Sequence, residues 1–444
     1  MTWKSYPSYK GSGVEWLGEI PAHWEVKRLK RVLAAPLKYG ANEPAELDDP
    51  DLPRYVRITD VDENDGLRNE TFKSLPVEIA REYILREGDL LFARSGATAG
   101  KTFLYRKSWG ACAYAGYLIR ARLDSSMACP EFIRYFTASM SYWQWIASTF
   151  IQATIQNVSA ERYASLSLPL PSVAEQHAIA AFLDGGTAKI DALIAKKERL
   201  LDLLQEKRTA LITQAVTKGL DLNVSMKASG IEWLGKIPAH WDVMKTKYAA
   251  SLRSGHTPSR QHPEYWENCT IPWFGLADVW QIRSGHTDYV FETNEKISSI
   301  GLANSAACLL PKGTVILSRT ASVGFSAIMN TPMATTQDYV NWICGESLIP
   351  EFLLYVFRAM TREFERLMMG STHQTIYMPD AARFVCPIPP LGEQRKIVTF
   401  IREQIGAIDK LIEKVHAAIN HLREYRAALI SAAVTGKIDV RGDL

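Results

Sequence analysis

Short apolar runs alternate with longer amphipathic stretches along this 444-residue chain. The runs 88–94 and 313–319 place consecutive apolar residues just after a glycine, a pattern typical of short buried strands. The stretches 130–148 and 350–368 each open with Pro-Glu, a favourable first helical turn, and carry amphipathic sequence. These patterns predict mixed α/β (α+β) domains.

Two further stretches, 187–217 and 405–434, predict long helices. Apolar positions that alternate by three and four residues predict a coiled-coil seam. The seam predicted in the second helix is Ile408, Leu411, Val415, Ala418, Leu422, Tyr425, Leu429 and Ala432. Its counterpart in the first helix is Ile190, Leu193, Lys197, Leu200, Leu204, Lys207, Leu211 and Gln214. A neighbouring stripe partly compensates for its polar residues, namely Ile194, Leu201 and Ile212. We expect antiparallel packing of the two helices; the alternative is that each packs only on its own domain.

The chain contains a duplication. Residues 12–30 (SGVEWLGEIPAHWEVKRLK) and 229–247 (SGIEWLGKIPAHWDVMKTK) are identical at 13 of 19 positions. A second match joins PLPSVAEQHAIAAFL at Pro169 to PIPPLGEQRKIVTFI at Pro387, and the interiors between the matches diverge. The second copy carries about seven extra residues between positions 278 and 313. The pattern predicts two similar modules with pseudo-twofold character, in which globular domains 1–167 and 221–385 are followed by helical segments 168–220 and 386–444.

Composition restricts the class of protein only broadly. Hydrophobic residues make up 47% and charged residues 22% of the chain, which is typical of globular proteins. No apolar stretch is long enough for a membrane span, and the start has no secretory pattern, so we expect no membrane association and a cytoplasmic location. The six cysteines form no C-x-x-C pair, and no metal site is predicted. A net charge of +3 neither requires nor excludes nucleic acid.

Two equivalent loops carry candidate binding chemistry. Each follows an apolar strand and combines an arginine with small or hydroxyl residues and a glycine. Arginine can read guanine or hold phosphate, and hydroxyls add phosphate contacts. The residues interpreted as DNA contacts are Arg94, Ser95, Thr98, Lys101, Arg319, Thr320 and Ser322. The alternatives are a tight hairpin with a solvated or carboxylate-paired arginine, and a phosphate-binding loop over 95–102. That loop lacks its first glycine and has no lysine in the second copy.

A second candidate is the polar segment before each proline cluster. Glutamine and asparagine can pair with adenine, although such a segment can equally be an ordinary capping loop. Its residues are Gln152, Thr154, Gln156, Asn157, Ser371, Thr372, His373 and Gln374. The repeated Trp-Leu-Gly…His-Trp openings predict core packing instead, with His23 and His240 making local hydrogen bonds.

The sequence lacks the common catalytic motifs. There is no Asp/Asn-Pro-Pro-aromatic segment for amino methylation, no G-x-G-x-x-G after a strand, no nucleophile elbow and no H-E-x-x-H. We therefore predict no catalytic, cofactor-binding or metal-binding residues in this chain.

The paired openings and the P-x-P-x-x-x-E-Q entries to long helices resemble the specificity subunit of type I restriction–modification systems over essentially the whole chain. The resemblance implies two target-recognition domains that each read half of a split site in double-stranded DNA, spaced by an antiparallel coiled coil. It also implies two methyltransferase subunits that use S-adenosylmethionine, and two restriction motor-nuclease subunits that use ATP and magnesium. The competing interpretations are a fused DNA methyltransferase or endonuclease, and a structural coiled-coil scaffold.

Overall fold

The computed structural model describes residues 3–62, 66–150, 157–221, 223–368 and 375–441. The chain divides into two compact units. The first unit comprises residues 1–198 and 416–444, and the second comprises residues 199–415. Two long helices, α5 (Val173–Lys218) and α11 (Leu391–Val434), each contribute one part to each unit.

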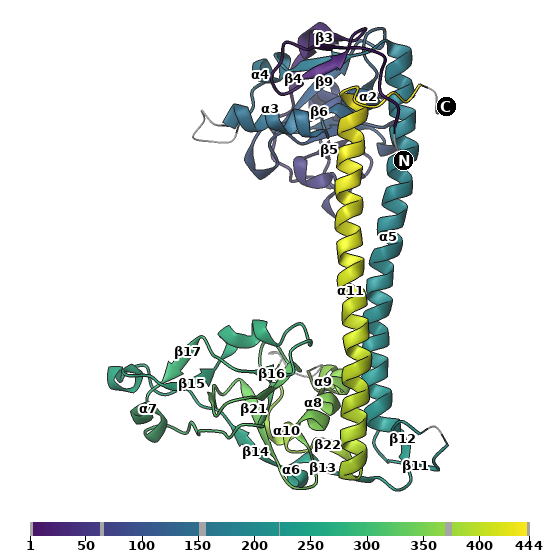
Figure 1. Cartoon of the computed structure of the whole chain (residues 1–444). Helices are drawn as coiled ribbons and strands as arrows, with labels where there is room; N and C mark the ends of the chain where they lie inside the picture. Colours follow the sequence, from purple (N-terminus) through teal and green to yellow (C-terminus); the bar gives the residue numbers. More distant parts are fainter. Residues whose placement is uncertain (1–2, 63–65, 151–156, 222, 369–374, 442–444) are drawn as a thin grey trace. The chain divides into compact units, whose positions relative to one another are not determined.

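The first unit combines short strands with helices, as the sequence predicts (Figure 1). Its strands are β1 (Tyr9–Gly11), β2 (Glu19–Pro21), β3 (Glu25–Arg28), β4 (Leu33–Tyr39), β5 (Arg54–Val56), β6 (Leu90–Ala93), β7 (Thr102–Leu104), β8 (Cys112–Tyr114), β9 (Leu118–Leu123) and β10 (Ser167–Leu170). Its shorter α-helices are α1 (Val77–Ala80), α2 (Pro130–Phe136), α3 (Met140–Phe150) and α4 (Ala160–Ala164).

The second unit repeats this composition of elements. Its strands are β11 (Met226–Ala228), β12 (Lys236–Pro238), β13 (Asp242–Lys245), β14 (Ala250–Ser254), β15 (Ile271–Phe274), β16 (Tyr289–Val290), β17 (Glu295–Ile297), β18 (Val315–Ser318), β19 (Ser326–Met329), β20 (Ala334–Thr335), β21 (Tyr339–Cys344) and β22 (Val385–Ile388). Its shorter α-helices are α6 (Thr246–Ala249), α7 (Ser299–Ala303), α8 (Pro350–Ala359), α9 (Thr361–Met368) and α10 (Met378–Ala381).

The two units share one strand topology. The main sheet has the order β4-β9-β6-β7 in the first unit, and β14-β21-β18-β19 in the second, where β16 extends it. A parallel pair lies beside each sheet, β5 with β8 and β15 with β20. The segment that follows β9, and its counterpart that follows β21, are helical, with a break after α2 and after α8. The predicted duplication is therefore a duplication of fold.

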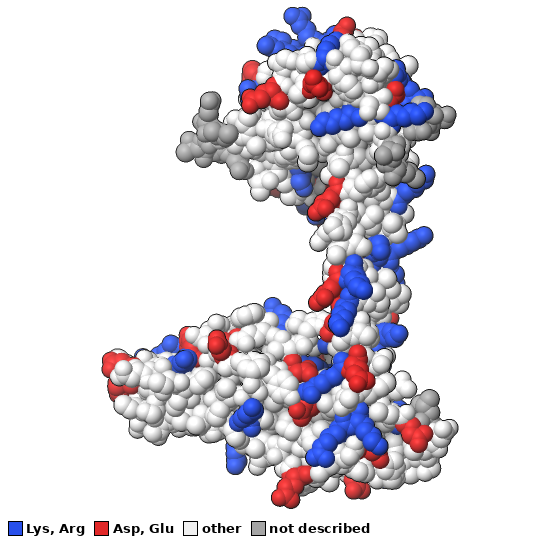
Figure 2. All heavy atoms as spheres, viewed as in Figure 1, with Lys and Arg blue, Asp and Glu red and all other residues white. Residues whose placement is uncertain are grey.

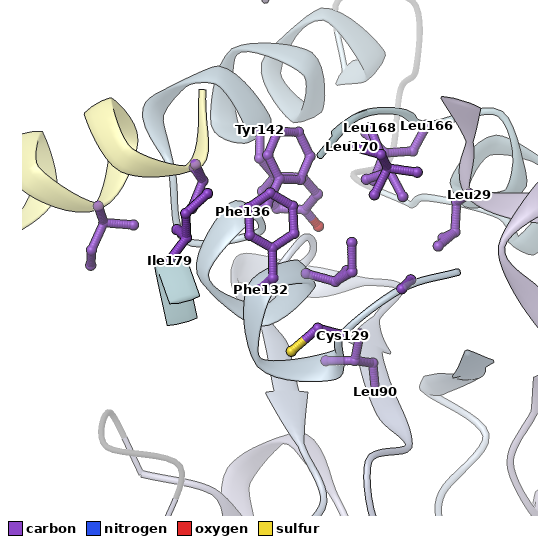
Figure 3. Close-up of a cluster of buried hydrophobic side chains, with 14 of the residues drawn as sticks. Leu29, Leu90, Cys129, Phe132, Phe136, Tyr142, Leu166, Leu168, Leu170 and Ile179 are labelled. Atoms are coloured by element: carbon purple, nitrogen blue, oxygen red, sulfur yellow. The ribbon is translucent and has the colours of Figure 1, made fainter. Parts of the chain in front are cut away.

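Aromatic and aliphatic side chains fill the core of each unit. In the first unit, Phe132 and Phe136 of α2 and Tyr142 of α3 are fully buried beside Ile179 of α5 (Figure 3). Trp24, from the repeated opening, is also fully buried, as is its counterpart Trp241. The predicted core role of the two openings is confirmed.

A Glu-Gln pair at the start of each long helix joins the two repeated motifs. Glu175 accepts hydrogen bonds from Trp24 Nε1 at 3.1 Å and contacts His23 Nε2 at 2.9 Å. In the second unit, Glu393 makes the same contacts with His240 and Trp241, at 2.7 and 2.8 Å. The local hydrogen bonds predicted for His23 and His240 are therefore present.

The glutamine of each pair accepts a hydrogen bond from a backbone N–H at the start of a shorter helix. Gln176 Oε1 accepts from the backbone N–H of Cys129, which precedes α2, at 2.8 Å. Gln394 Oε1 accepts from the N–H of Ile349, which precedes α8, at 3.0 Å. Both glutamines are fully buried, so these bonds supply partners that a buried helix end requires.

The long helices pack antiparallel within each unit, as predicted (Figure 1). In the first unit, Asp191 of α5 pairs with Arg426 of α11 at 2.8 Å, and a Cβ on Gly186 would touch Leu429. In the second unit, Arg208 of α5 lies 3.6 Å from Asp409 of α11. Position 190 therefore lies near the C-terminal part of α11, because its neighbour Asp191 pairs there.

The predicted coiled-coil seam is wrong at several of its alternate positions. Leu193 and Leu411 are each 43% exposed, and Tyr425 is 47% exposed. The inward face instead continues from Ile190 to Ile194, a residue of the predicted neighbouring stripe, and from Ile408 to Ile412, so the second apolar position comes one residue later. The other half of the predicted seam is correct, as the buried Leu204, Val415 and Leu429 demonstrate.

The two ends of the chain pack on the same unit. The backbone N–H of Asp439 donates to the carbonyl of Lys4 at 2.7 Å, and Tyr9 OH donates to the carbonyl of Gly436 at 3.1 Å. Val440 is fully buried in the first core. Across the described residues, no helix combines the length and apolar character needed to cross a membrane.

Candidate nucleic-acid interface

The arginine loop of the first unit and Asn157, the described residue of its second candidate segment, meet at one end of the main sheet. We call this the first loop edge, formed by Arg94–Lys101, Tyr117 and Asn157. The backbone N–H of Arg94 donates to the carbonyl of Tyr117 at 3.0 Å, and the carbonyl of Arg94 accepts from Val158 at 2.8 Å. Ser95 and Asn157 form an antiparallel bridge. Asn157, the described residue of the second candidate segment, therefore lies beside the arginine loop.

The second unit builds the same arrangement, the second loop edge, from Arg319–Gly324, Gln337–Asp338 and Thr375. The N–H of Arg319 donates to the carbonyl of Asp338 at 2.9 Å, and its carbonyl accepts from Ile376 at 2.8 Å. Thr320 and Thr375 form the matching antiparallel bridge. The backbone frame is thus shared, while the side chains at equivalent positions differ.

A glycine closes each loop in a conformation that side chains disfavour. Gly100 has a φ of +93° and Gly324 a φ of +92°, and each donates its N–H back to the strand before the loop. A Cβ on Gly324 would also lie 3.1 Å from Phe364 of α9. At the tip, Gly96 of the first loop matches Ala321 of the second, whose φ of 58° is strained for a residue with a Cβ.

The two arginines have different surroundings. The Arg94 guanidinium lies over the Tyr39 ring at 4.8 Å, and its Nε donates to Asn157 Oδ1 at 3.4 Å. Arg319 Nε donates to the carbonyl of Gln337 at 2.7 Å, and its Nη1 donates to the carbonyl of Ile376 at 3.3 Å. Both side chains are partly exposed. Each arginine helps to hold its edge together and keeps unused donors, because a guanidinium has five.

The other predicted contacts divide into two groups. Ser95, Thr98, Thr320 and Ser322 lie partly exposed in the loops, and Lys101 is exposed just before β7. Asn157 is exposed at the first loop edge. The remaining predicted residues lie outside the described part of the chain: Gln152, Thr154, Gln156, Ser371, Thr372, His373 and Gln374.

Two residues at the loop edges, Tyr117 and Gln337, are not among the contacts predicted from the sequence. Tyr117 is 65% exposed, and its carbonyl binds the N–H of Arg94. In the second unit the equivalent carbonyl is that of Asp338, and the adjacent Gln337 is exposed, where its side chain accepts from Thr257 at 2.7 Å. Only the pairing of β9 with β6, and of β21 with β18, brings these turns beside the arginine loops. No local motif signals this.

One pair of side chains resembles a nucleophile and its base. Cys129 Sγ lies 3.3 Å from His177 Nδ1 and 3.2 Å from Glu131 Oε2. Burial raises the pKa of the Cys129 thiol to about 11, so the thiol remains protonated at neutral pH. This cysteine is 1% exposed, so the arrangement is a packed structural contact. Within the described residues, no group of three or more potential ligands could hold a metal ion.

One face of the molecule carries charges of both signs. On the face drawn in Figure 2, lysine and arginine alternate with aspartate and glutamate in both units. That face is therefore not uniformly basic.

Comparisons with known proteins agree with the duplicated architecture. The family model described as "Type I restriction modification DNA specificity domain" matches residues 21–202 and 238–421. The chain is 23% identical over 436 residues to the type I restriction enzyme MjaVIII specificity subunit of Methanocaldococcus jannaschii, covering 95% of this chain and 94% of that protein.

Two solved structures share the fold. One, from work on complex assembly and conformational transition of the type I R-M system, has a TM-score of 0.71 at 18% identity and covers 96% of this chain and 99% of its own. The other, the HsdS subunit from Thermoanaerobacter tengcongensis, has a TM-score of 0.56 at 18% identity and covers 94% and 98%. Since the family model matches both copies across most of the sequence, this chain belongs to the type I restriction–modification DNA specificity family.

Proposed function

We propose that this chain reads a bipartite site in double-stranded DNA, with one loop edge for each half-site. The observation that carries the proposal is the repeated backbone frame with different side chains at equivalent positions. The first frame presents Tyr117 and Asn157, whereas the second presents Asp338 and Thr375. Different side chains on equivalent frames are expected if each frame reads a different base sequence.

The proposal extends to the partners of the chain. The chain would recruit two methyltransferase subunits and two restriction motor-nuclease subunits to the bound site, without catalysing a reaction itself. S-adenosylmethionine, ATP and magnesium would serve the partners, and this chain would take no cofactor. Family membership supports these roles, and the antiparallel helices give the two recognition domains a continuous helical connection.

The test is methylation mapping with the full chain and its partner methyltransferase subunits. Arg94→Ala should weaken or relax one half of the methylated sequence, and Arg319→Ala should affect the other half. The expected loss is about 1–3 kcal/mol if the arginine reads a base. If it only holds phosphate, the loss should be uniform across sequences and the salt slope should fall by about one.

Matched controls lie at the opposite end of each main sheet. Lys30 precedes β4, whose Leu33 pairs with Leu123, and Lys247 precedes β14, whose Ala250 pairs with Cys344. Both lysines are exposed, and alanine at either should leave both half-sites unchanged. The proposal is wrong if either arginine variant alters both half-sites.

A further inference from the structure

An exposed apolar and basic face adjoins the second loop edge. It belongs to the 3-10 helix Leu276–Gln281 and the turn after it. Val279 and Ile282 point into the core, being 7% and 1% exposed. Trp280 and Arg283 therefore share the outward face, because residues three apart align on such a helix. Trp280 is 66% exposed, the highest value among the tryptophans in the described residues.

Side-chain contacts place this face beside the candidate loop. Arg283 Nη2 donates to Ser322 Oγ of the second loop edge at 3.4 Å. Gln281 Nε2 donates to the carbonyl of Glu292 at 3.2 Å, which ties the 3-10 helix to the segment after β16. We call Trp280 and Arg283 the tryptophan face.

The segment behind the tryptophan face is anchored to packed helices. Asp288 accepts from Arg358 Nη1 at 2.7 Å and from Tyr355 OH at 2.8 Å, both on α8. His286 Nδ1 lies 3.0 Å from Asp409 Oδ2 on α11. An anchored segment presents its side chains with little loss of conformational entropy on binding.

The first copy has no equivalent tryptophan. Its buried Val61 matches Val279 at the 218-residue offset, and the next residue is Asp62 where the second copy has Trp280. Asp62 Oδ1 accepts from the N–H of Gly66 at 2.8 Å, within its own turn. The extra residues of the second copy also fall in this region of the sequence. A feature confined to one copy fits recognition of one half-site.

We propose that the tryptophan face binds DNA and helps determine the second half-site. The Trp280 indole would pack against sugars and base edges, including thymine methyl groups, while Arg283 would bind phosphate. DNA is favoured over a protein partner because Arg283 and Arg319 border the same edge. The inference rests on the proposed function, since it assumes that the second loop edge faces DNA.

The experiment measures binding of the full chain, with its methyltransferase subunits, to duplexes that carry the methylation-mapped site. A second duplex has the second half-site scrambled. The Trp280→Ala variant should bind the intact site about ten- to hundredfold more weakly than the unchanged chain does. Its loss of affinity for the scrambled duplex should be smaller. Trp280→Phe should recover part of the affinity. Arg283→Ala should weaken binding to both duplexes and lower the salt slope by about one.

Tyr248→Ala is the control, because Tyr248 is 71% exposed beside β14 at the far end of the sheet. It should bind both duplexes like the unchanged chain. The inference is overturned if Trp280→Ala discriminates between the duplexes as the unchanged chain does, or if it impairs only assembly with the methyltransferase. If the unchanged chain itself does not discriminate between them, the proposed function fails instead.

Discussion

At the scale of single residues, Glu175 makes more hydrogen bonds than its counterpart Glu393. Besides His23 and Trp24, Glu175 accepts from Tyr6 OH at 2.8 Å. Its side chain is 6% exposed, whereas that of Glu393 is 39% exposed. Burial, followed by the hydrogen bond to Glu175, raises the pKa of Tyr6 well above its usual range, so the phenol remains a donor.

This difference predicts unequal losses of stability. Glu175→Ala should destabilise the first unit by about 3 kcal/mol, because several buried donors lose their charged acceptor. Glu393→Ala should cost about 1 kcal/mol, since water can replace part of its contacts. Hydrogen exchange of the amides in β2 and β12 measures both losses. Exposed Glu161 of α4 provides the control, and equal losses for Glu175 and Glu393 would contradict the argument.

At the scale of elements, the long helices carry a repeated charged pair on their contact face. Asp191 with Arg426 and Arg208 with Asp409 are related by the 218-residue repeat. The Arg208 side chain is 5% exposed, and desolvation, with a contribution from nearby Arg358, lowers its pKa. Arg208 also donates to the carbonyl of Gly285. Buried charges at such positions can fix the register of paired helices.

Removal of the counter-charge tests this role. Asp409→Asn should destabilise the second unit by about 3 kcal/mol, because it leaves the buried guanidinium of Arg208 without its carboxylate. Asp191→Asn should cost at most about 1 kcal/mol, because Asp191 and Arg426 are 41% and 35% exposed. Hydrogen exchange along α5 reports both changes. Similar losses for the two variants would show that burial does not set the strength of the pairs.

At the scale of the whole molecule, the proposed function makes the two helices a spacer between half-sites. Seven residues inserted after Glu198 in α5 and after Val415 in α11 should preserve the heptad phase and lengthen each helix by about 10 Å. About 10 Å of duplex corresponds to roughly three base pairs. Methylation mapping should therefore find both half-sites unchanged and the spacer longer by about three base pairs.

An insertion in one helix alone is the appropriate control, because it places the two parts of the seam out of register. That variant should lose site-specific methylation. A double insertion that changes base preference and leaves the spacing unaltered would contradict the spacer role.

The sequence by itself determined the duplication, the mixed domains, the long antiparallel helices and the core role of Trp24 and Trp241. These follow from repeated motifs and from apolar periodicity, which act locally along the chain. Tertiary structure decided which helix face is buried. Both Leu411 and Ile412 fit an alternation of threes and fours after Ile408, and only packing selects Ile412.

Tertiary structure also decided the composition of the loop edges. The sequence identified Arg94 and Asn157 as separate candidates, but their contact depends on a bridge between segments more than sixty residues apart. Tyr117 and Trp280 carry no local motif, because their exposure depends on which neighbouring side chains enter the core. Periodicity can report the local shape of the chain, whereas distant pairing and burial are set only when the whole unit packs.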